Sequence, residues 1–247
     1  MHKILKILLA GEGGQGIQSI AEIVAEAANR EGKEALYIPN FGVEQRGGIS
    51  MAYLQITEAD EKIGAPKFET ADILIALSAR AIARTRHYAG EETLYIYDNS
   101  LIEPAQVNDE IIGLQYFEST PPCPTDQAEI KTAAEDLGDN RSCFYFHEAE
   151  NAENKERKIP RKVGRVIAIA ANDTAKNELH PRVFNIMILG TLLAATSIMP
   201  LEAVQRALEE KLGHKFQKDP KLRELNEQAL AKGYEMFAAL VEGGKNG

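Results

Sequence analysis

The chain has 247 residues, of which 44% are hydrophobic and 26% are charged. These proportions are ordinary for a soluble globular protein and argue against global disorder. The length suits one domain with an elaboration. A formal net charge of -9 argues against a general affinity for nucleic acid, because nonspecific binding to phosphates needs clustered Lys and Arg.

The sequence contains few residues that could hold a metal or form a disulfide. Cys123 and Cys143 are too few for a disulfide framework or a four-thiolate iron–sulfur site. Cys143 and His147 could form a nucleophile pair, but two reduced structural thiols are the preferred interpretation. The five histidines are scattered without metal-ligand spacing. We therefore assign no catalytic residue and no metal ligand to this chain.

Two apolar stretches bear on membrane association. The N-terminus, MHKILKILLAGEGG, has a short apolar stretch that runs into a glycine turn, which favours a buried strand over a leader peptide. The longest apolar run, residues 183–199, falls short of the roughly 20 residues that span a bilayer, and it contains Asn185. We interpret this run as a core helix and expect a cytoplasmic protein without membrane contact.

The predicted elements begin as the first half of a βαβ unit. Residues 3–10 are expected to form a strand, and residues 17–30 form a helix after the glycine turn between them. The apolar face of this helix comprises Ile17, Ile20, Ala21, Val24 and Ala28. Gly32 is expected to end the helix in a left-handed conformation.

More strands follow along the chain. Residues 35–38 predict a short strand stopped by Pro39. In residues 50–57 the apolar side chains of Ala52, Leu54 and Ile56 alternate with a second set, Met51, Tyr53, Gln55 and Thr57. This alternation predicts a strand in a sheet with unequal faces. Nearly continuous apolar runs, typical of strands covered on both faces, lie at residues 71–77, 93–97 and 163–170.

The C-terminal portion is expected to be helical. Pro181, Pro200 and Pro220 each suit the first position of an amphipathic helix, and Asp219 is well placed to cap the last of these helices. The order of elements predicts an α/β fold, a three-layer, doubly wound, mainly parallel sheet with a helical C-terminal portion.

One segment differs in character from the rest. Residues 117–160 contain ten acidic and five basic residues, together with several prolines. This composition is poorly suited to a strand layer covered on both faces. We expect a single domain over residues 1–247, with an insertion at residues 117–160.

The sharpest motif is GEGGQG, between the first strand and the first helix. It comprises Gly11, Glu12, Gly13, Gly14, Gln15 and Gly16. Glycines there permit a tight turn and close approach of the backbone to a phosphate, and the helix N-terminus supplies free N–H groups. The alternative is a turn that binds no ligand, because a tight turn between a strand and a helix requires glycine for its backbone conformation alone.

A dinucleotide site would also need an acidic residue at the end of the second strand. The sequence there is Tyr37-Ile38-Pro39-Asn40, and Glu34 lies at the start of the strand. The usual contact to the ribose of NAD is therefore missing.

A second glycine-rich segment, NFGVEQRGG, enters the third strand. Its candidate binding residues are Glu44, Arg46, Gly47 and Gly48, and the Arg46 fork could bind phosphate or carboxylate. Strand ends that meet at one edge of the sheet should bring this loop to the first glycine turn. Alternatively, Arg46 pairs with Glu44 or with a partner subunit.

Together these motifs amount to a resemblance. GEGGQG, then FGVEQRGG, and then the pattern N-x-x-x-L-G at residues 185–190 resemble the gamma subunit, or gamma-like domain, of 2-oxoacid:ferredoxin oxidoreductases. The resemblance implies a complex that decarboxylates a 2-oxoacid on thiamine diphosphate, forms an acyl-CoA and passes electrons through iron–sulfur clusters to ferredoxin.

The resemblance also implies how the work is divided among subunits. Partner chains would hold thiamine diphosphate and the clusters, and this chain alone would hold none of these groups. Its glycine segments and Asn185 would help to shape the entrance for coenzyme A (CoA). The choice of 2-oxoacid is not encoded in these motifs. Two other functions stay open, a stand-alone NAD(P)-binding oxidoreductase and a purely structural subunit.

Overall fold

The computed structural model describes residues 4–41, 48–102 and 164–243. Among the predicted residues, Glu44, Arg46, Gly47 and the insertion at 117–160 lie outside these ranges. The strands are β1 (Leu5–Glu12), β2 (Lys33–Phe41), β3 (Ile49–Glu58), β4 (Ile73–Ala76), β5 (Leu94–Asp98) and β6 (Arg165–Ile169). The helices are α1 (Ile17–Arg30), α2 (Ala79–Thr85), η1 (Arg86–Tyr88), α5 (Ala171–Glu178), η4 (Pro181–Val183), α6 (Phe184–Thr196), α7 (Leu201–Lys218) and α8 (Pro220–Gly243).

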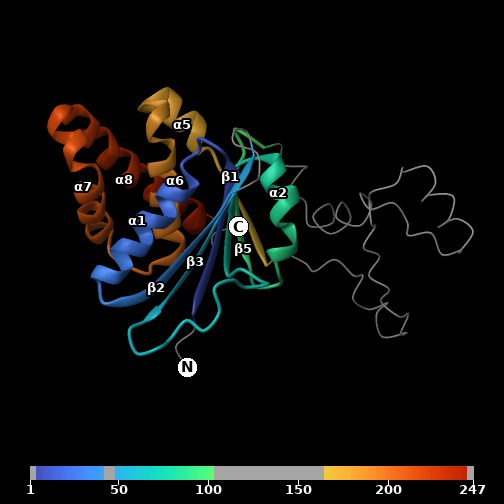
Figure 1. Cartoon of the computed structure of the whole chain (residues 1–247). Coiled ribbons are helices and arrows are strands. Elements are labelled where there is room, and N and C mark those ends of the chain that lie inside the picture. Colours follow the sequence, from blue (N-terminus) through green and yellow to red (C-terminus); the bar gives the residue numbers. More distant parts are fainter. Residues whose placement is uncertain (1–3, 42–47, 103–163, 244–247) are drawn as a thin grey trace, which may run out of the picture.

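The strands form one six-stranded sheet in the order β2-β3-β1-β4-β5-β6. β1, β4, β5 and β6 run parallel, whereas β3 is antiparallel to both β1 and β2. Helices α1 and α5–α8 cover one face, and α2 lies on the other (Figure 1). The predicted three-layer, mainly parallel α/β class with a helical C-terminal portion is therefore confirmed.

Strand β1 shows how the sheet separates two cores. Ile7 and Leu9 point into a larger core with α1 and the C-terminal helices, while Leu8 and Ala10 point into a smaller core with α2. All four side chains are fully buried. Apolar residues at successive positions are therefore required here, because both faces of the strand are covered.

Helix α1 has the bounds that its apolar periodicity predicts. The predicted face is buried throughout, and the helix packs it against the sheet. Gly32, just after the helix, has a φ of 77°, as expected for a left-handed residue that ends it.

One expectation for the sheet is wrong. Strand β2 runs through Pro39 to Phe41, because it is an edge strand, where a residue that lacks a backbone N–H is tolerated.

Strand β3 forms where the alternation predicts it and is buried on both faces. Ala52, Leu54 and Ile56 lie in the larger core, and Met51 and Tyr53 lie in the smaller one. Gln55 donates to the Ala65 carbonyl at 2.6 Å, which satisfies its buried amide.

Helices α6 and α8 pack closely against each other. Helix α6 is buried over most of its length, as predicted for the apolar run. A Cβ on Gly190 would lie 2.1 Å from the Leu230 carbonyl oxygen of α8, and one on Gly233 would lie 2.0 Å from that of Met187 in α6. Only glycine permits this approach. Helix α5 was not anticipated from the sequence.

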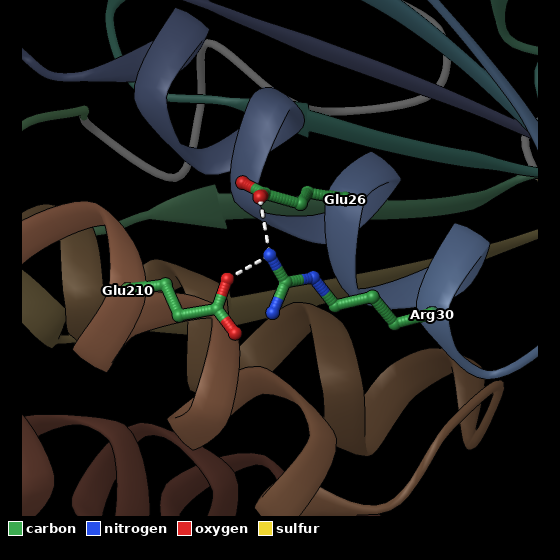
Figure 2. A network of polar contacts seen from close by, with 3 residues as sticks. All are labelled: Glu26, Arg30 and Glu210. Carbon is green, nitrogen blue, oxygen red and sulfur yellow. Dashed lines mark hydrogen bonds and ion pairs between the residues drawn. The ribbon is translucent and has the colours of Figure 1, made fainter.

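Helix α7 is joined to α1 by ion pairs at the surface. Arg30 of α1 lies between Glu26, at 2.8 Å, and Glu210 of α7 (Figure 2). Arg206 also pairs with Glu31 at 2.6 Å. These groups are largely exposed, so each pair contributes about 1 kcal/mol or less, and the buried apolar contacts carry most of the stability. Over the described ranges, no helix combines the length and apolar character needed to cross a membrane.

Candidate functional site

The glycine turn lies at the edge of the sheet where the helices that follow two neighbouring strands pack on opposite faces. Helix α1 follows β1 and packs on one face, whereas α2 follows the neighbouring strand β4 and packs on the other. This divergence is the topological switch point of the sheet. In open α/β sheets, ligands bind outside the carboxyl ends of the strands at such a point.

The turn exposes backbone rather than side chains. Gly14 has a φ of 102° and Gly16 a φ of 78°, conformations that residues with a Cβ rarely adopt. Gly13 and Gly14 are exposed, and the space where a Cβ on Gly14 would stand is open. A ligand can therefore approach the backbone closely at this position.

Gln15 uses its side chain inside the protein. Its Oε1 accepts a hydrogen bond from the Glu12 backbone N–H at 2.6 Å, and its Nε2 donates to the Leu77 carbonyl at 2.9 Å. A Cβ on Gly11 would lie only 2.5 Å from that Oε1. Gly11 thus leaves room for the Gln15 amide, a role that its place in the motif does not reveal.

Gly48, the last residue of the second glycine segment, lies at the turn, as the sequence predicts. The Gly13 backbone N–H donates to the Gly48 carbonyl at 3.2 Å, next to the pairing of Glu12 with Ile49. Gly48 is buried. The antiparallel direction of β3 explains the meeting, because its first residue lies opposite the last residue of β1.

Asn185 brings the third motif to the same place. A Cβ on Gly16 would lie 2.8 Å from the Asn185 Cβ and 2.9 Å from its Nδ2. The half-buried Asn185 side chain, from the first turn of α6, thus lies against the residue that caps α1. Gly190, at the end of the same motif, packs on α8 instead and has a structural role.

The electrostatics of this corner favour an anion. The first hydrogen bond inside α1 joins the Ile20 N–H to the Gly16 carbonyl, so the N–H groups of residues 17–19 have no acceptor within the helix. No acidic residue occupies the first turn. N–H groups without an intrahelical acceptor and the positive end of the helix dipole both favour negative charge.

Gln18 anchors the start of α1 and was missed by sequence reasoning. Its Nε2 donates to Ser50 Oγ at 2.7 Å and to the Met51 carbonyl at 3.0 Å, and its Oε1 accepts from the Tyr37 hydroxyl at 2.6 Å. Burial, with a smaller effect from Glu22, raises the pKa of Tyr37, so this hydroxyl stays a donor. No spacing in the sequence signals these contacts, because they depend on how strands β2 and β3 pair.

A buried carboxylate at the same sheet edge was also missed. Asp98, at the end of β5, accepts hydrogen bonds from the Ser100 N–H at 2.9 Å and from the Asn172 N–H at 2.8 Å. Burial raises the pKa of Asp98, while these hydrogen bonds oppose the rise. Asp98 thereby caps α5 from a neighbouring strand, which is a structural role. In the described part of the chain, no group of three or more His, Cys, Asp or Glu could hold a metal ion.

Comparison with known proteins agrees with this architecture. The family profile described as pyruvate ferredoxin/flavodoxin oxidoreductase matches residues 6–236. The pyruvate synthase subunit PorC of Thermotoga maritima is 25% identical over 233 residues, which cover 94% of each chain. The ketoisovalerate oxidoreductase subunit VorA of Methanothermobacter thermautotrophicus is 32% identical over 96 residues, or 39% of this chain, and the match spans 20% of VorA.

Two solved structures share the fold. The keto/oxoacid ferredoxin oxidoreductase gamma subunit from Geobacter sulfurreducens superposes with a TM-score of 0.58 at 22% identity, over 95% of this chain and 99% of that chain. The 2-oxoglutarate:ferredoxin oxidoreductase from Magnetococcus marinus, solved with 2-oxoglutarate, coenzyme A and succinyl-CoA bound, superposes with a TM-score of 0.63 at 22% identity. That superposition covers 96% of this chain and 31% of the other.

The profile match runs from the first strand into the last helix, and the gamma subunit from Geobacter sulfurreducens is matched over 99% of its length. The resemblance inferred from the three motifs is thereby confirmed. The chain belongs to the pyruvate ferredoxin/flavodoxin oxidoreductase family.

Proposed function

We propose that this chain is the gamma-type subunit of a cytoplasmic 2-oxoacid:ferredoxin oxidoreductase and shapes the site where CoA enters. The complex would convert a 2-oxoacid and CoA into an acyl-CoA and carbon dioxide, with ferredoxin as the electron acceptor. The observation that carries the proposal is the convergence of three motifs, at Gly13, Gly48 and Asn185, on the N-terminus of α1.

CoA suits this corner chemically. Its diphosphate and its ribose phosphate carry the negative charge that a helix N-terminus stabilises. The exposed backbone at Gly13 and Gly14 allows a phosphate to approach, and the Asn185 amide adds a polar group beside it. Arg46, which lies outside the described residues, is proposed to add a charge-assisted contact. The relative from Magnetococcus marinus, which has CoA bound, supports the choice of ligand.

Thiamine diphosphate and the iron–sulfur clusters are assigned to partner subunits. The two cysteines of this chain are too few for a cluster, and Gly138-Asp139-Asn140 is only a fragment of a thiamine diphosphate motif. The chemistry of decarboxylation and electron transfer is then supplied by those groups in the complex. The residues of this chain bind and orient CoA, and its surface supports assembly.

A stand-alone NAD(P)-dependent enzyme is the second candidate. Strand β2 ends at Asn40 and Phe41, neither of which offers the carboxylate that binds the ribose hydroxyls of NAD. This absence counts against the candidate. Fluorescence titration of the isolated chain with NADH tests it, and we expect no saturable binding.

Substitution of Gly13 by valine tests the proposal. Gly13 is exposed, so the branched side chain should leave the core intact while it blocks approach to the turn. In the purified complex, the KM for CoA should rise and the KM for the 2-oxoacid should stay unchanged. A complex that assembles normally and shows unaltered CoA kinetics would leave this chain a structural role.

A further inference from the structure

We infer that Gln15 is a positioning residue, whose side-chain amide fixes the shape of the glycine turn for CoA. This inference rests on the function proposed above. It assigns to Gln15 an indirect role, through the backbone that it holds, in place of direct contact with the ligand.

The Gln15 amide joins two strands beyond the point where their pairing ends. The parallel ladder between β1 and β4 closes with Ala10 opposite Ala76, and the Leu77 N–H then donates to the Ala10 carbonyl at 2.9 Å. Gln15 continues this connection from the turn, since it donates to the Leu77 carbonyl and accepts from the Glu12 N–H. The turn is thus tied to the end of β4, at the switch point of the sheet.

The rest of the turn supplies little that could replace these bonds. Four of its six residues are glycines, which have no side chain and the widest choice of backbone conformation. Two backbone hydrogen bonds, Gln15 N–H to the Glu12 carbonyl and Gly13 N–H to the Gly48 carbonyl, also hold it. The hydrogen bond from the Gln15 side chain to the Leu77 carbonyl holds the turn against the end of β4.

The missing Cβ at Gly11 gives an independent sign that this amide has a fixed place. A Cβ there would lie 2.5 Å from Gln15 Oε1 and 3.1 Å from two carbons of Ile17. Gly11→Ala therefore displaces the amide without changing residue 15. Without the amide, the turn becomes ordered only when the ligand binds. The free energy needed to order it then weakens binding.

The test measures steady-state kinetics of the purified complex with Gln15→Met in this chain. Methionine keeps the length of the side chain and removes both hydrogen bonds. We expect the KM for CoA to rise about tenfold, the size expected from losing two ordinary hydrogen bonds, with the KM for the 2-oxoacid unchanged. If this variant does not assemble, Gln15→Glu keeps the shape and the acceptor for Glu12 and loses the donor to Leu77.

Gln55→Met is the matched control. Gln55 is a buried glutamine of β3 that lies opposite Lys6, at the end of β1 away from the turn, and its Nε2 donates to the Ala65 carbonyl at 2.6 Å. The substitution should lower the stability of the chain and leave the KM for CoA unchanged. A readout of stability alone would not separate the two glutamines, whereas the KM for CoA does.

A double substitution adds a second check. Because Gly11→Ala acts by displacing the amide, its effect on the KM for CoA should largely vanish in the Gln15→Met background. Additive effects would overturn the inference. An unchanged KM in Gln15→Met, with a raised KM in Arg46→Ala, would remove the positioning role and keep the proposed function. If neither variant changes the KM, both are wrong.

Discussion

Replacement of Gly190 by alanine tests how α6 and α8 are held together. The added Cβ would lie 2.1 Å from the Leu230 carbonyl oxygen and 2.9 Å from the Tyr234 nitrogen. Both are backbone atoms, so no side chain can rotate away. Restoring an ordinary contact of at least 3.4 Å requires the helices to separate by more than about 1 Å, which also loosens the apolar contacts around them.

Overpacking of this kind costs about 1–3 kcal/mol, and more where backbone must move. We therefore expect Gly190→Ala to lower the free energy of unfolding, measured by urea denaturation and circular dichroism, by at least about 2 kcal/mol. Gly213→Ala in α7 is the control. Its Cβ would meet nothing closer than 3.7 Å, so it should stabilise the chain by about 0.5–1 kcal/mol. Equal stability of the Gly190→Ala variant and the parent would show that close packing of α6 on α8 does not require a glycine at this position.

Two further predictions concern charged groups. Burial raises the pKa of Asp98 in the folded chain, so the folded state binds this proton more tightly and stability should fall as pH rises from the unfolded pKa, about 4, through the raised value. Asp98→Asn should remove that part of the pH dependence in denaturation curves, and an unchanged profile would contradict the assignment. Arg30→Ala, which removes the pairs with Glu26 and Glu210, should cost about 1 kcal/mol or less, and high salt should reduce the difference. A loss of several kcal/mol would show that these pairs matter more than their exposure suggests.

The sequence predicted best where structure is determined locally. Helix α1 was placed at its observed bounds because apolar periodicity, the glycines before it and Gly32 after it all act within a few residues. Pro39 was misread because its effect depends on whether the strand lies at the edge of the sheet. The order of strands is not a local property.

The same distinction applies to the site. The glycine motifs were found because their spacing is local, and Asn185 because it belongs to a third motif. The bond from Gln15 to Leu77 joins residues 62 positions apart, and the two bonds from Gln18 to β3 depend on strand register. Sequence spacing alone cannot predict such contacts, since only the folded sheet brings these atoms together.

Arg46→Ala tests whether this chain binds CoA through its glycine segments. Loss of a charge-assisted contact costs about 1.5–3 kcal/mol, so the KM for CoA should rise roughly 10- to 150-fold. The measurement is the initial rate of 2-oxoacid oxidation by the purified complex as CoA is varied, with subunit association checked by gel filtration. We expect a raised KM for CoA in a fully assembled complex. Unchanged CoA kinetics in such a complex would show that Arg46 does not bind CoA.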